Sequence, residues 1–246
     1  MDCRRGLKDL TNNSIDVTIT SPPYNLRGAV RGEKYKSYND DLLDHAYFSF
    51  IEDTIIELLR VTKYYVFFNF QILSNNKLVY LELMNKYKKN IKDVIMWCKS
   101  PVNPSIQPTC LTSIFEIVIV FSNETYASRR TFERAFFNNR ESGELNTNVI
   151  HTKRAIHENS KLSGNGLNTA LFPESFVRWF LEKFTKENDV VLDPFMGLGT
   201  TAVVCKKMKR QYIGFEISQD SINFAKDRLD KTEIDRRTEP NWDVIY

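Results

Sequence analysis

The stretch DVVLDPFMGLGTT, residues 189–201, decides the fold of this chain of 246 residues. It begins with a short apolar run, passes through an acidic residue and a glycine turn, and ends in two threonines that can cap a helix. This order predicts a buried strand, a tight turn and a helix running through Ala202 to Met208, which is typical of a nucleotide-binding α/β sheet.

The same turn indicates the kind of ligand. Gly197 and Gly199 permit positive φ and a close backbone approach, and Asp193 can accept a hydrogen bond from a cationic amine. The chain lacks the G-x-x-x-x-G-K-[ST] motif of triphosphate sites and the third glycine of a dinucleotide fingerprint. About twenty residues on, the next strand ends in Glu216, where a carboxylate commonly binds ribose hydroxyls. A cationic or amphoteric nucleoside ligand is therefore expected, and a plain strand-to-helix connection is the alternative.

A second motif, VTITSPPYN at residues 17–25, is a β-branched strand that ends in Ser-Pro-Pro-Tyr. Methylation of an exocyclic amino nitrogen needs hydrogen-bond acceptors that hold this weakly nucleophilic nitrogen pyramidal. Ser21 offers a hydroxyl and Pro22 a carbonyl, and the Pro22-Pro23 pair fixes φ twice, so these acceptors are preorganised. Tyr24 offers a flat face for a base taken out of its stack. A rigid turn without chemistry is the alternative.

Together, these motifs resemble the DNA amino-methyltransferases that use S-adenosylmethionine, in the branch where the catalytic segment precedes the cofactor segment. The family usually has a short strand before an Asp-Cys pair, whereas only Met1 precedes that pair here. Shorter pieces also match the family: Asp2-Cys3, Asp16, Trp97-x-Lys99, Phe115-Glu116 and Phe172-Pro173-Glu174.

The resemblance implies which residues form the site. It assigns the methionine end of the cofactor to the Asp193 region, the ribose to Glu216 and the adenine edge to Asp2, with Phe172 and Phe195 as walls of the pocket. The implied catalytic residues are Ser21, Pro22, Pro23 and Tyr24. The implied cofactor-binding residues are Asp2, Cys3, Phe172, Asp193, Pro194, Phe195, Gly197, Gly199, Thr200, Thr201 and Glu216.

The residue at the first position of the tetrapeptide bears on the target base. In the resembled family, serine favours N4 of cytosine and aspartate favours N6 of adenine, so Ser21 favours cytosine. Methylation of cytosine C5 is disfavoured because that reaction uses a thiolate, and the chain has no Pro-Cys. The resemblance implies a restriction–modification context. Adenine N6 is the alternative target, and a non-catalytic DNA-binding subunit is a more distant one. An amide methyltransferase would have the cofactor motif first, and a nicotinamide oxidoreductase would need the third glycine.

The rest of the chain alternates strands and helices, which predicts one α/β domain over residues 1–246 with a doubly wound, mostly parallel Rossmann-like sheet. Both motifs follow strand ends, so one cleft is expected to hold both reactants. The aromatic residues of strand 64–70 are expected in the core. The other expected strands are 15–20, 92–98, 115–121, 189–193 and 211–216, and the expected helices are 44–60, 74–87, 173–184, 200–208 and 218–229.

Two segments fall outside this alternation and are candidate contacts for double-stranded DNA. Residues 25–40 are basic and contain glycines, which predicts a mobile loop that closes on phosphates. A solvated loop is the alternative. Residues 122–168 interleave arginines with aromatic residues and are predicted to be the inserted target-recognition region. The candidate DNA-binding residues are Arg27, Arg31, Lys34, Lys36, Arg129, Arg130 and Arg134. Because this region is small, a homodimer is a candidate assembly, and a cognate restriction endonuclease is a candidate partner.

Composition agrees with this interpretation. The formal charge of +3 allows a polyanionic partner without indicating one. The four cysteines show no C-x-x-C spacing and the three histidines no metal-ligand pattern, so reduced thiols and no metal are expected. No segment approaches eighteen consecutive apolar residues, and the first residues lack an apolar signal region. A cytoplasmic protein without a membrane partner is therefore expected.

Overall fold

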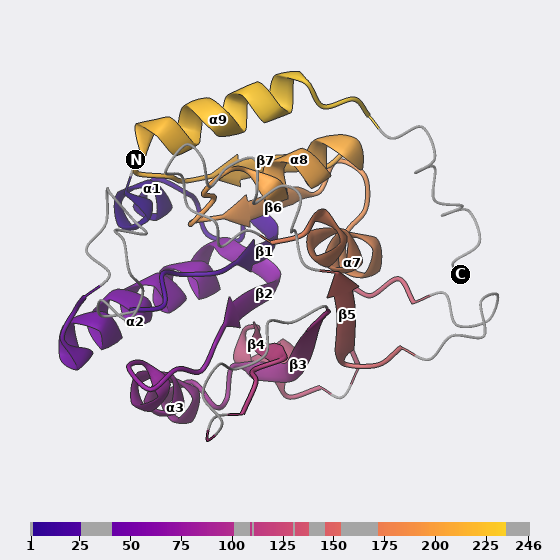
Figure 1. Cartoon of the computed structure of the whole chain (residues 1–246). Coiled ribbons are helices and arrows are strands. Elements are labelled where there is room, and N and C mark those ends of the chain that lie inside the picture. Colours follow the sequence, from indigo (N-terminus) through magenta and orange to yellow (C-terminus); the bar gives the residue numbers. More distant parts are fainter. Residues whose placement is uncertain are drawn as a thin grey trace.

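The computed structural model describes residues 2–25, 41–100, 109, 111–129, 131–137, 146–153 and 172–234. These residues form a seven-stranded sheet (Figure 1). In spatial order its strands are β5 (Val149–Lys153), β3 (Ile91–Ser100), β4 (Phe115–Phe121), β2 (Thr62–Phe70), β1 (Ile15–Thr20), β6 (Val190–Asp193) and β7 (Gln211–Gly214). Strand β4 is antiparallel to both of its neighbours, and every other pairing is parallel. The predicted mostly parallel α/β sheet is confirmed.

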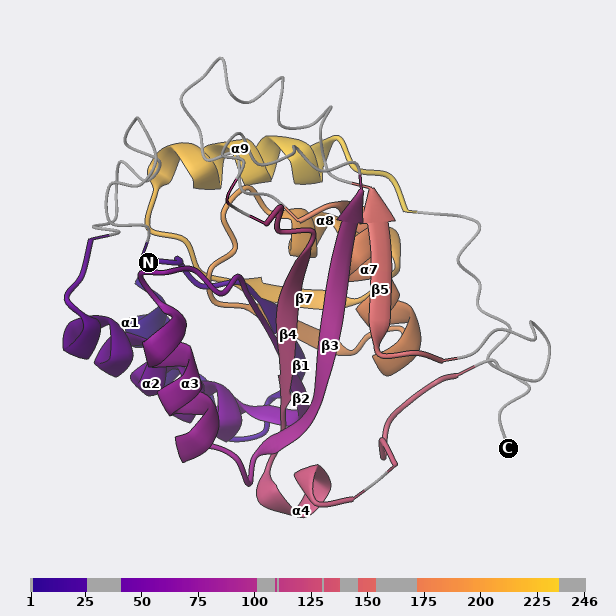
Figure 2. The ribbon, with the colours of Figure 1, turned by 60° about the horizontal axis from the view of Figure 1, so that its bottom comes forward.

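Helices cover both faces of this sheet (Figure 2). On one face lie α1 (Cys3–Lys8), α2 (Asp44–Val61) and α3 (Lys77–Lys86). On the other face lie α7 (Glu174–Phe184) and α8 (Thr200–Lys207), and α9 (Gln219–Asp230) packs on α8. The short helix α4 (Glu124–Ala127) follows β4. The sheet is therefore doubly wound, as expected.

Strand β2 shows why its sequence is a nearly continuous apolar run. Tyr65 and Phe67 belong to the core cluster under α7 and α8, whereas Val66, Phe68 and Phe70 belong to the cluster under α2 and α3. All of them are almost fully buried. Because successive side chains point to opposite faces, a strand covered on both faces is apolar at most of its positions. The prediction that these aromatic residues are core is confirmed.

Three elements were not predicted from the sequence: α1, α4 and β5. Residues 3–8 form a helix whose first turn is capped by Asp2, which accepts from the backbone N–H of Arg4. Strand β5 lies inside the range 122–168, pairs with β3 and is an outermost strand of the sheet. Part of the predicted insertion is therefore a strand of the central sheet.

Candidate active site

The candidate site lies at one edge of the sheet. The parallel strands β1, β2, β6 and β7 end at this edge, and the antiparallel strand β4 begins there. The edge therefore collects Ser21, Asn69, Glu116 and Asp193, which come from distant parts of the sequence. Thr20 Oγ1 donates to Asp193 Oδ1 at 2.9 Å, which joins the segment before Ser21 directly to the glycine-turn segment. The two sequence motifs are thus adjacent in space.

The glycine turn has the backbone that its sequence predicts. Gly197 and Gly199 have φ of 53° and 79°, a region that residues with a Cβ rarely adopt. Gly199 is the N-cap of α8 and has no side-chain cap, so the expected threonine cap is wrong. A Cβ on Gly199 would lie 2.8 Å from the Cβ of Ala225 on α9, whereas one on Gly197 would meet nothing closer than 4.0 Å. The turn is therefore closed on one side and open at Gly197.

Asp193 holds this edge together. Its carboxylate is only 4% exposed and accepts hydrogen bonds from the hydroxyls of Thr20 and Thr201 and from the backbone N–H of Phe195. Burial raises the pKa of Asp193 to about 6, against the lowering effect of these hydrogen bonds. Thr201 donates at 2.7 Å, so its hydroxyl binds the strand end instead of capping α8. The carboxylate thus links β1, the turn and α8.

Glu216 closes the turn from the side of β7. Its Oε2 accepts from the N–H of Gly197 at 2.9 Å, and its Oε1 accepts from the N–H groups of Ile217 and Ser218. These three bonds fix the carboxylate beside the open position at Gly197. Its place next to the glycine turn agrees with the order expected from the sequence.

The first helix also reaches this region. A Cβ on Gly6 of α1 would lie 2.4 Å from the ring of Phe215, the residue that follows β7. The Arg4 guanidinium lies 5.6 Å from the centroid of Phe50, and that ring contacts Phe195 edge-on at 5.8 Å. The amino-terminal helix is therefore packed directly against the residue that follows β7, and it is connected to Phe195 of the glycine-turn segment through the ring of Phe50.

Asp2 and Cys3 differ in their surroundings. The Asp2 carboxylate is exposed and binds Arg4, which lowers the pKa of Asp2. The Cys3 thiol is buried, and burial raises its pKa to about 12. A thiol with this pKa is not a nucleophile at neutral pH, so Cys3 acts here as a packing residue.

Phe172 and the start of α7 lie on the opposite face of the sheet from α1. The Phe172 ring stacks on Phe176 with centroids 4.6 Å apart and contacts Trp97 of β3 edge-on. Two residues later, Glu174 forms ion pairs with Lys207 and Arg228. Arg228 in turn donates to the carbonyl of Leu198 and to the hydroxyl of Thr200. The start of α7 is thus connected to the glycine turn through Arg228.

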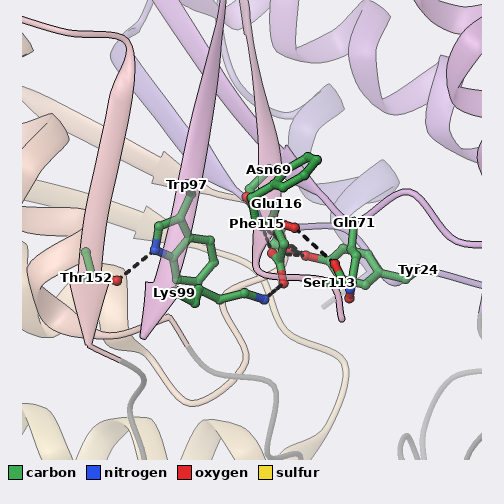
Figure 3. Close-up of polar contacts among 10 residues, drawn as sticks. Tyr24, Asn69, Gln71, Trp97, Lys99, Ser113, Phe115, Glu116 and Thr152 are labelled. Atoms are coloured by element: carbon green, nitrogen blue, oxygen red, sulfur yellow. Dashed lines mark hydrogen bonds and ion pairs between the residues drawn. The ribbon is translucent and has the colours of Figure 1, made fainter. Parts of the chain in front are cut away.

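A chain of hydrogen bonds runs through the Ser-Pro-Pro-Tyr segment (Figure 3). Ser21 Oγ donates to Tyr24 Oη at 2.8 Å, and Tyr24 Oη donates to Glu116 Oε2 at 3.0 Å. Asn69 Nδ2 donates to Tyr24 Oη at 2.9 Å and to Glu116 Oε2 at 2.7 Å. Lys99 forms an ion pair with Glu116. The network unites residues from β2, β3 and β4 with the predicted catalytic loop.

Three members of this network, Asn69, Lys99 and Glu116, had no role assigned from the sequence. Glu116 was noted only as part of a matching fragment, and Asn69 is a single polar residue in the apolar run of β2. Asn69 is 1% exposed, and among the residues that the structure describes its Oδ1 has no hydrogen-bond partner. A lone buried amide in an otherwise apolar strand was the available signal, because such a group needs partners.

Side chains from the face covered by α2 and α3 hold the backbone of the catalytic loop through hydrogen bonds. Tyr47 Oη donates to the Pro23 carbonyl at 2.7 Å, and Asn76 Nδ2 donates to the Tyr24 carbonyl at 2.9 Å. Within the described part of the chain, the Pro22 carbonyl has no donor. Burial and the nearby Glu116 raise the pKa of Tyr24, so its phenol stays protonated. The loop thus keeps one carbonyl and one serine hydroxyl available as acceptors.

The candidate DNA-binding residues fall into three groups. Arg130 and the basic residues of the loop, Arg27, Arg31, Lys34 and Lys36, lie outside the described residues. Arg129 is exposed and pairs with Glu133. Arg134 pairs with Asp189, immediately before β6, and lies 4.8 Å from the Tyr64 ring centroid. It is therefore at the opposite edge of the sheet from Asp193, and the structure does not bring it to the candidate site.

Among the residues that the structure describes, no group of three or more His, Cys, Asp or Glu side chains could hold a metal ion. In the same ranges, none of the helices has the length and hydrophobicity that crossing a membrane requires.

Comparison with known proteins gives consistent matches. A family model described as DNA methylase matches residues 15–227. The type II methyltransferase M.HpaI of Haemophilus parainfluenzae is 26% identical over 249 residues, which cover 92% of this chain and 71% of the relative. M.HinfI of Haemophilus influenzae is 27% identical over 247 residues, with 93% and 66% covered.

Solved structures resemble the fold over nearly the whole chain. The PvuII DNA methyltransferase (cytosine-N4-specific) has a TM-score of 0.69 at 19% identity, covering 93% of this chain and 84% of that one. The M1.HpyAVI–SAM complex has a TM-score of 0.61 at 22% identity, covering 93% and 96%. At these identities the likeness concerns the fold.

Proposed function

Because the chain belongs to the DNA methylase family of N6- and N4-methyltransferases, we propose that it methylates N4 of cytosine in a base flipped out of duplex DNA. The methyl donor of this family is S-adenosyl-L-methionine. The observation that carries the proposal is the pair of available acceptors, Ser21 Oγ and the Pro22 carbonyl, beside the glycine turn. The serine supports cytosine as the target, as does the cytosine-N4 specificity of the PvuII enzyme.

The residues at the strand ends fit the cofactor. The open position at Gly197 lets a ligand approach the backbone, and the Asp193 carboxylate is a buried negative charge that a cationic amine would stabilise. We infer that Asp193 and the glycine turn hold the methionine end and that Glu216 holds the ribose. Phe195 and Phe172 remain proposed walls of the pocket, Asp2 remains the proposed contact of the adenine edge, and Cys3 remains a proposed cofactor-binding residue. When bound, the cofactor supplies an electrophilic methyl group on its sulfonium.

The catalytic loop would act on the amino group of the base. Ser21 Oγ and the Pro22 carbonyl accept from its N–H bonds, which draws the nitrogen lone pair out of conjugation with the ring. The proposed methyl donor lies on the neighbouring segment, because Asp193 is hydrogen-bonded to Thr20, the residue before Ser21. The lone pair of the base nitrogen would therefore be directed toward that segment. Tyr24 presents a ring for stacking, and its hydroxyl fixes the orientation of that ring. In-line transfer requires this kind of positioning more than any further chemical group.

The DNA duplex would be held by segments outside the sheet edge. We propose residues 25–40 as the phosphate-binding loop and residues 122–168 as the recognition region, with Arg129 and Arg130 as contacts. The type II relatives support a role in restriction and modification, and a cognate endonuclease and a second copy of the chain remain proposed partners.

One experiment tests the target base. The purified chain is incubated with S-adenosyl-L-methionine and unmethylated DNA of mixed sequence, and the digested nucleosides are identified by mass spectrometry. Detection of N4-methylcytosine supports the proposal. Detection of N6-methyladenine would change the assigned target base to adenine and leave the assigned amino-methyl transfer unchanged. Absence of product with measurable cofactor binding points to a missing partner subunit or a different substrate, whereas absence of cofactor binding points to the non-catalytic DNA-binding subunit.

Two substitutions test the catalytic assignment. Ser21→Ala and Tyr24→Ala are expected to bind the cofactor normally in calorimetry and to lose turnover, because neither side chain contacts the Asp193 carboxylate. Near-wild-type turnover in either variant would show that the catalytic residues are assigned wrongly.

A further inference from the structure

The hydrogen bonds of the catalytic loop have a fixed direction. Tyr24 Oη accepts from Ser21 Oγ and from Asn69 Nδ2, so its only proton is left for Glu116 Oε2. Asn69 Nδ2 also donates to Glu116, and an amide nitrogen cannot accept. The Ser21 hydroxyl proton is therefore committed to Tyr24, so Ser21 Oγ can act toward the base only as an acceptor. Among the described residues, the donor that contacts Ser21 Oγ is Asn69 Nδ2, at a long 3.5 Å.

This direction ends at a charged group. Glu116 is 7% exposed and carries the nearest negative charge along the chain of bonds from Ser21. Its Oε1 is paired with Lys99 from β3, and its Oε2 faces Tyr24 and the neutral Asn69 from β2. A buried carboxylate needs such partners to remain ionised. Hydrogen bonds in series polarise one another, so the charge of Glu116 is transmitted to Ser21.

We propose that Ser21, Tyr24 and Glu116 form a proton relay, in which Glu116 strengthens Ser21 as an acceptor during methyl transfer and then takes the proton. This proposal rests on the proposed amino-methyltransferase function. It explains how a neutral hydroxyl serves at a position where a carboxylate would accept more strongly. The carboxylate is present, but it acts through two hydrogen bonds instead of directly.

The relay balances in protons and electrons. The nitrogen lone pair forms the new N–C bond, the electron pair of the S–C bond stays on sulfur, and the nitrogen becomes positively charged. One N–H proton then passes to Ser21 Oγ, the Ser21 hydroxyl proton passes to Tyr24 Oη, and the Tyr24 proton passes to Glu116 Oε2. Serine and tyrosine end neutral, the methylated amine ends neutral, and Glu116 ends as a carboxylic acid beside Lys99. Solvent then removes this proton before the next turnover.

The geometry gives separate roles to the other two residues. Asn69 is a positioning residue, since its two N–H bonds occupy acceptor sites on Tyr24 and Glu116 and thereby set the direction of the relay. Lys99 is also a positioning residue, since its ion pair with Glu116 Oε1 leaves Oε2 turned toward Tyr24. Neither needs to contact the base.

The test uses Glu116→Gln and Tyr24→Phe, which keep the shapes of the side chains and remove the relay. The matched control is Thr152→Val, which removes the 2.7 Å hydrogen bond from Trp97 Nε1 at the same edge but lies outside the relay. Wild-type activity is first established from the methylated nucleoside, so a failure of the proposed function is seen before any variant is compared. Single-turnover rates are then measured against pH in water and in deuterium oxide.

In both relay variants we expect the rate to fall by about 100-fold, as for loss of a general acid–base group. The acid limb of the rate–pH profile and the multi-proton solvent isotope effect should disappear, while cofactor affinity in calorimetry stays within about twofold. Glu116→Asp should recover part of the rate, and Thr152→Val should match wild type. Rates within about threefold of wild type in both relay variants, or a slow rate that keeps the wild-type pH profile and isotope effect, would overturn the relay.

Discussion

Replacing Gly199 by alanine tests whether the glycine turn is fixed by packing or only by backbone conformation. Gly199 has φ of 79°, and a Cβ there would lie 2.8 Å from the Cβ of Ala225 and 3.4 Å from its Cα. Alanine in the left-handed region costs about 1–2 kcal/mol. Forcing a methyl group into a packed contact adds about 1–3 kcal/mol, because the backbone of α9 has to move.

Gly197 is the matched control two residues away. It also has positive φ, at 53°, but a Cβ there has no neighbour closer than 4.0 Å. Gly197→Ala should therefore lose only the conformational part, about 1–2 kcal/mol. A more restricted unfolded chain returns about 0.4–1 kcal/mol to each variant. The expected loss is thus about 2–4 kcal/mol at Gly199 and about 1 kcal/mol or less at Gly197.

The assay is urea unfolding followed by circular dichroism, with thermal unfolding as a second measurement. For a chain of this length, 1 kcal/mol corresponds to about 2–4 °C in Tm. Gly199→Ala should therefore melt roughly 5–15 °C below wild type, and Gly197→Ala within about 4 °C of it. Equal losses in the two variants would refute the reasoning, since the packing against Ala225 would then contribute nothing.

Four further predictions follow from contacts described above. The pKa of Asp193 is raised to about 6, so the folded state binds a proton more tightly than the unfolded one. Stability should therefore fall as pH rises from about 4 to about 6, and urea unfolding at several pH values will show whether Asp193→Asn removes this dependence. A cationic amine prefers the ionised carboxylate, so cofactor affinity in calorimetry should weaken as pH falls through about 6 in wild type and stay flat in Asp193→Asn. Arg134→Ala breaks a largely buried ion pair with Asp189 and should cost about 3 kcal/mol, whereas Arg129→Ala breaks an exposed pair with Glu133 and should leave Tm close to that of wild type. An effect of Arg134→Ala on DNA affinity alone, with Tm unchanged, would contradict this. Gly6→Ala would place a methyl group 2.4 Å from the Phe215 ring and should weaken cofactor binding in calorimetry, while unchanged affinity would show that α1 does not support the site.

Much of the sheet could be predicted because its strands carry strong local signals. The strand before Ser21 and the strand before Asp193 are short apolar runs that end in proline or glycine turns, and their order along the chain was enough to place both at one edge. Helix α1 was missed because six residues with a central Gly6 show no helical periodicity, and its place depends on the ring of Phe215. Strand β5 was missed because it is short and half polar.

The site residues that were not predicted are brought together by the register between strands, and a single sequence does not reveal that register. Glu116 reaches Tyr24 because β4 runs antiparallel to β2, with Ile117 opposite Phe70, so the first residues of β4 lie beside the last residues of β2. A shift of one residue would turn Glu116 to the other face. Arg134 was predicted to bind DNA from its charge and its aromatic neighbours, and its actual partner, Asp189, lies 55 residues away along the chain.

Because β1 pairs with β6, the catalytic edge does not depend on which of the two motif-bearing halves comes first along the chain. Val17 lies opposite Val191 and Thr18 opposite Leu192, and the Thr20–Asp193 bond spans 173 residues. Nothing in this junction requires the base-binding half to be translated first, because the two halves meet through lateral strand pairing and one carboxylate. A circularly permuted chain that began with α7 and joined its original ends by a suitable linker would build the same edge. The catalytic face is thus invariant to a rearrangement that would make the linear sequences difficult to align.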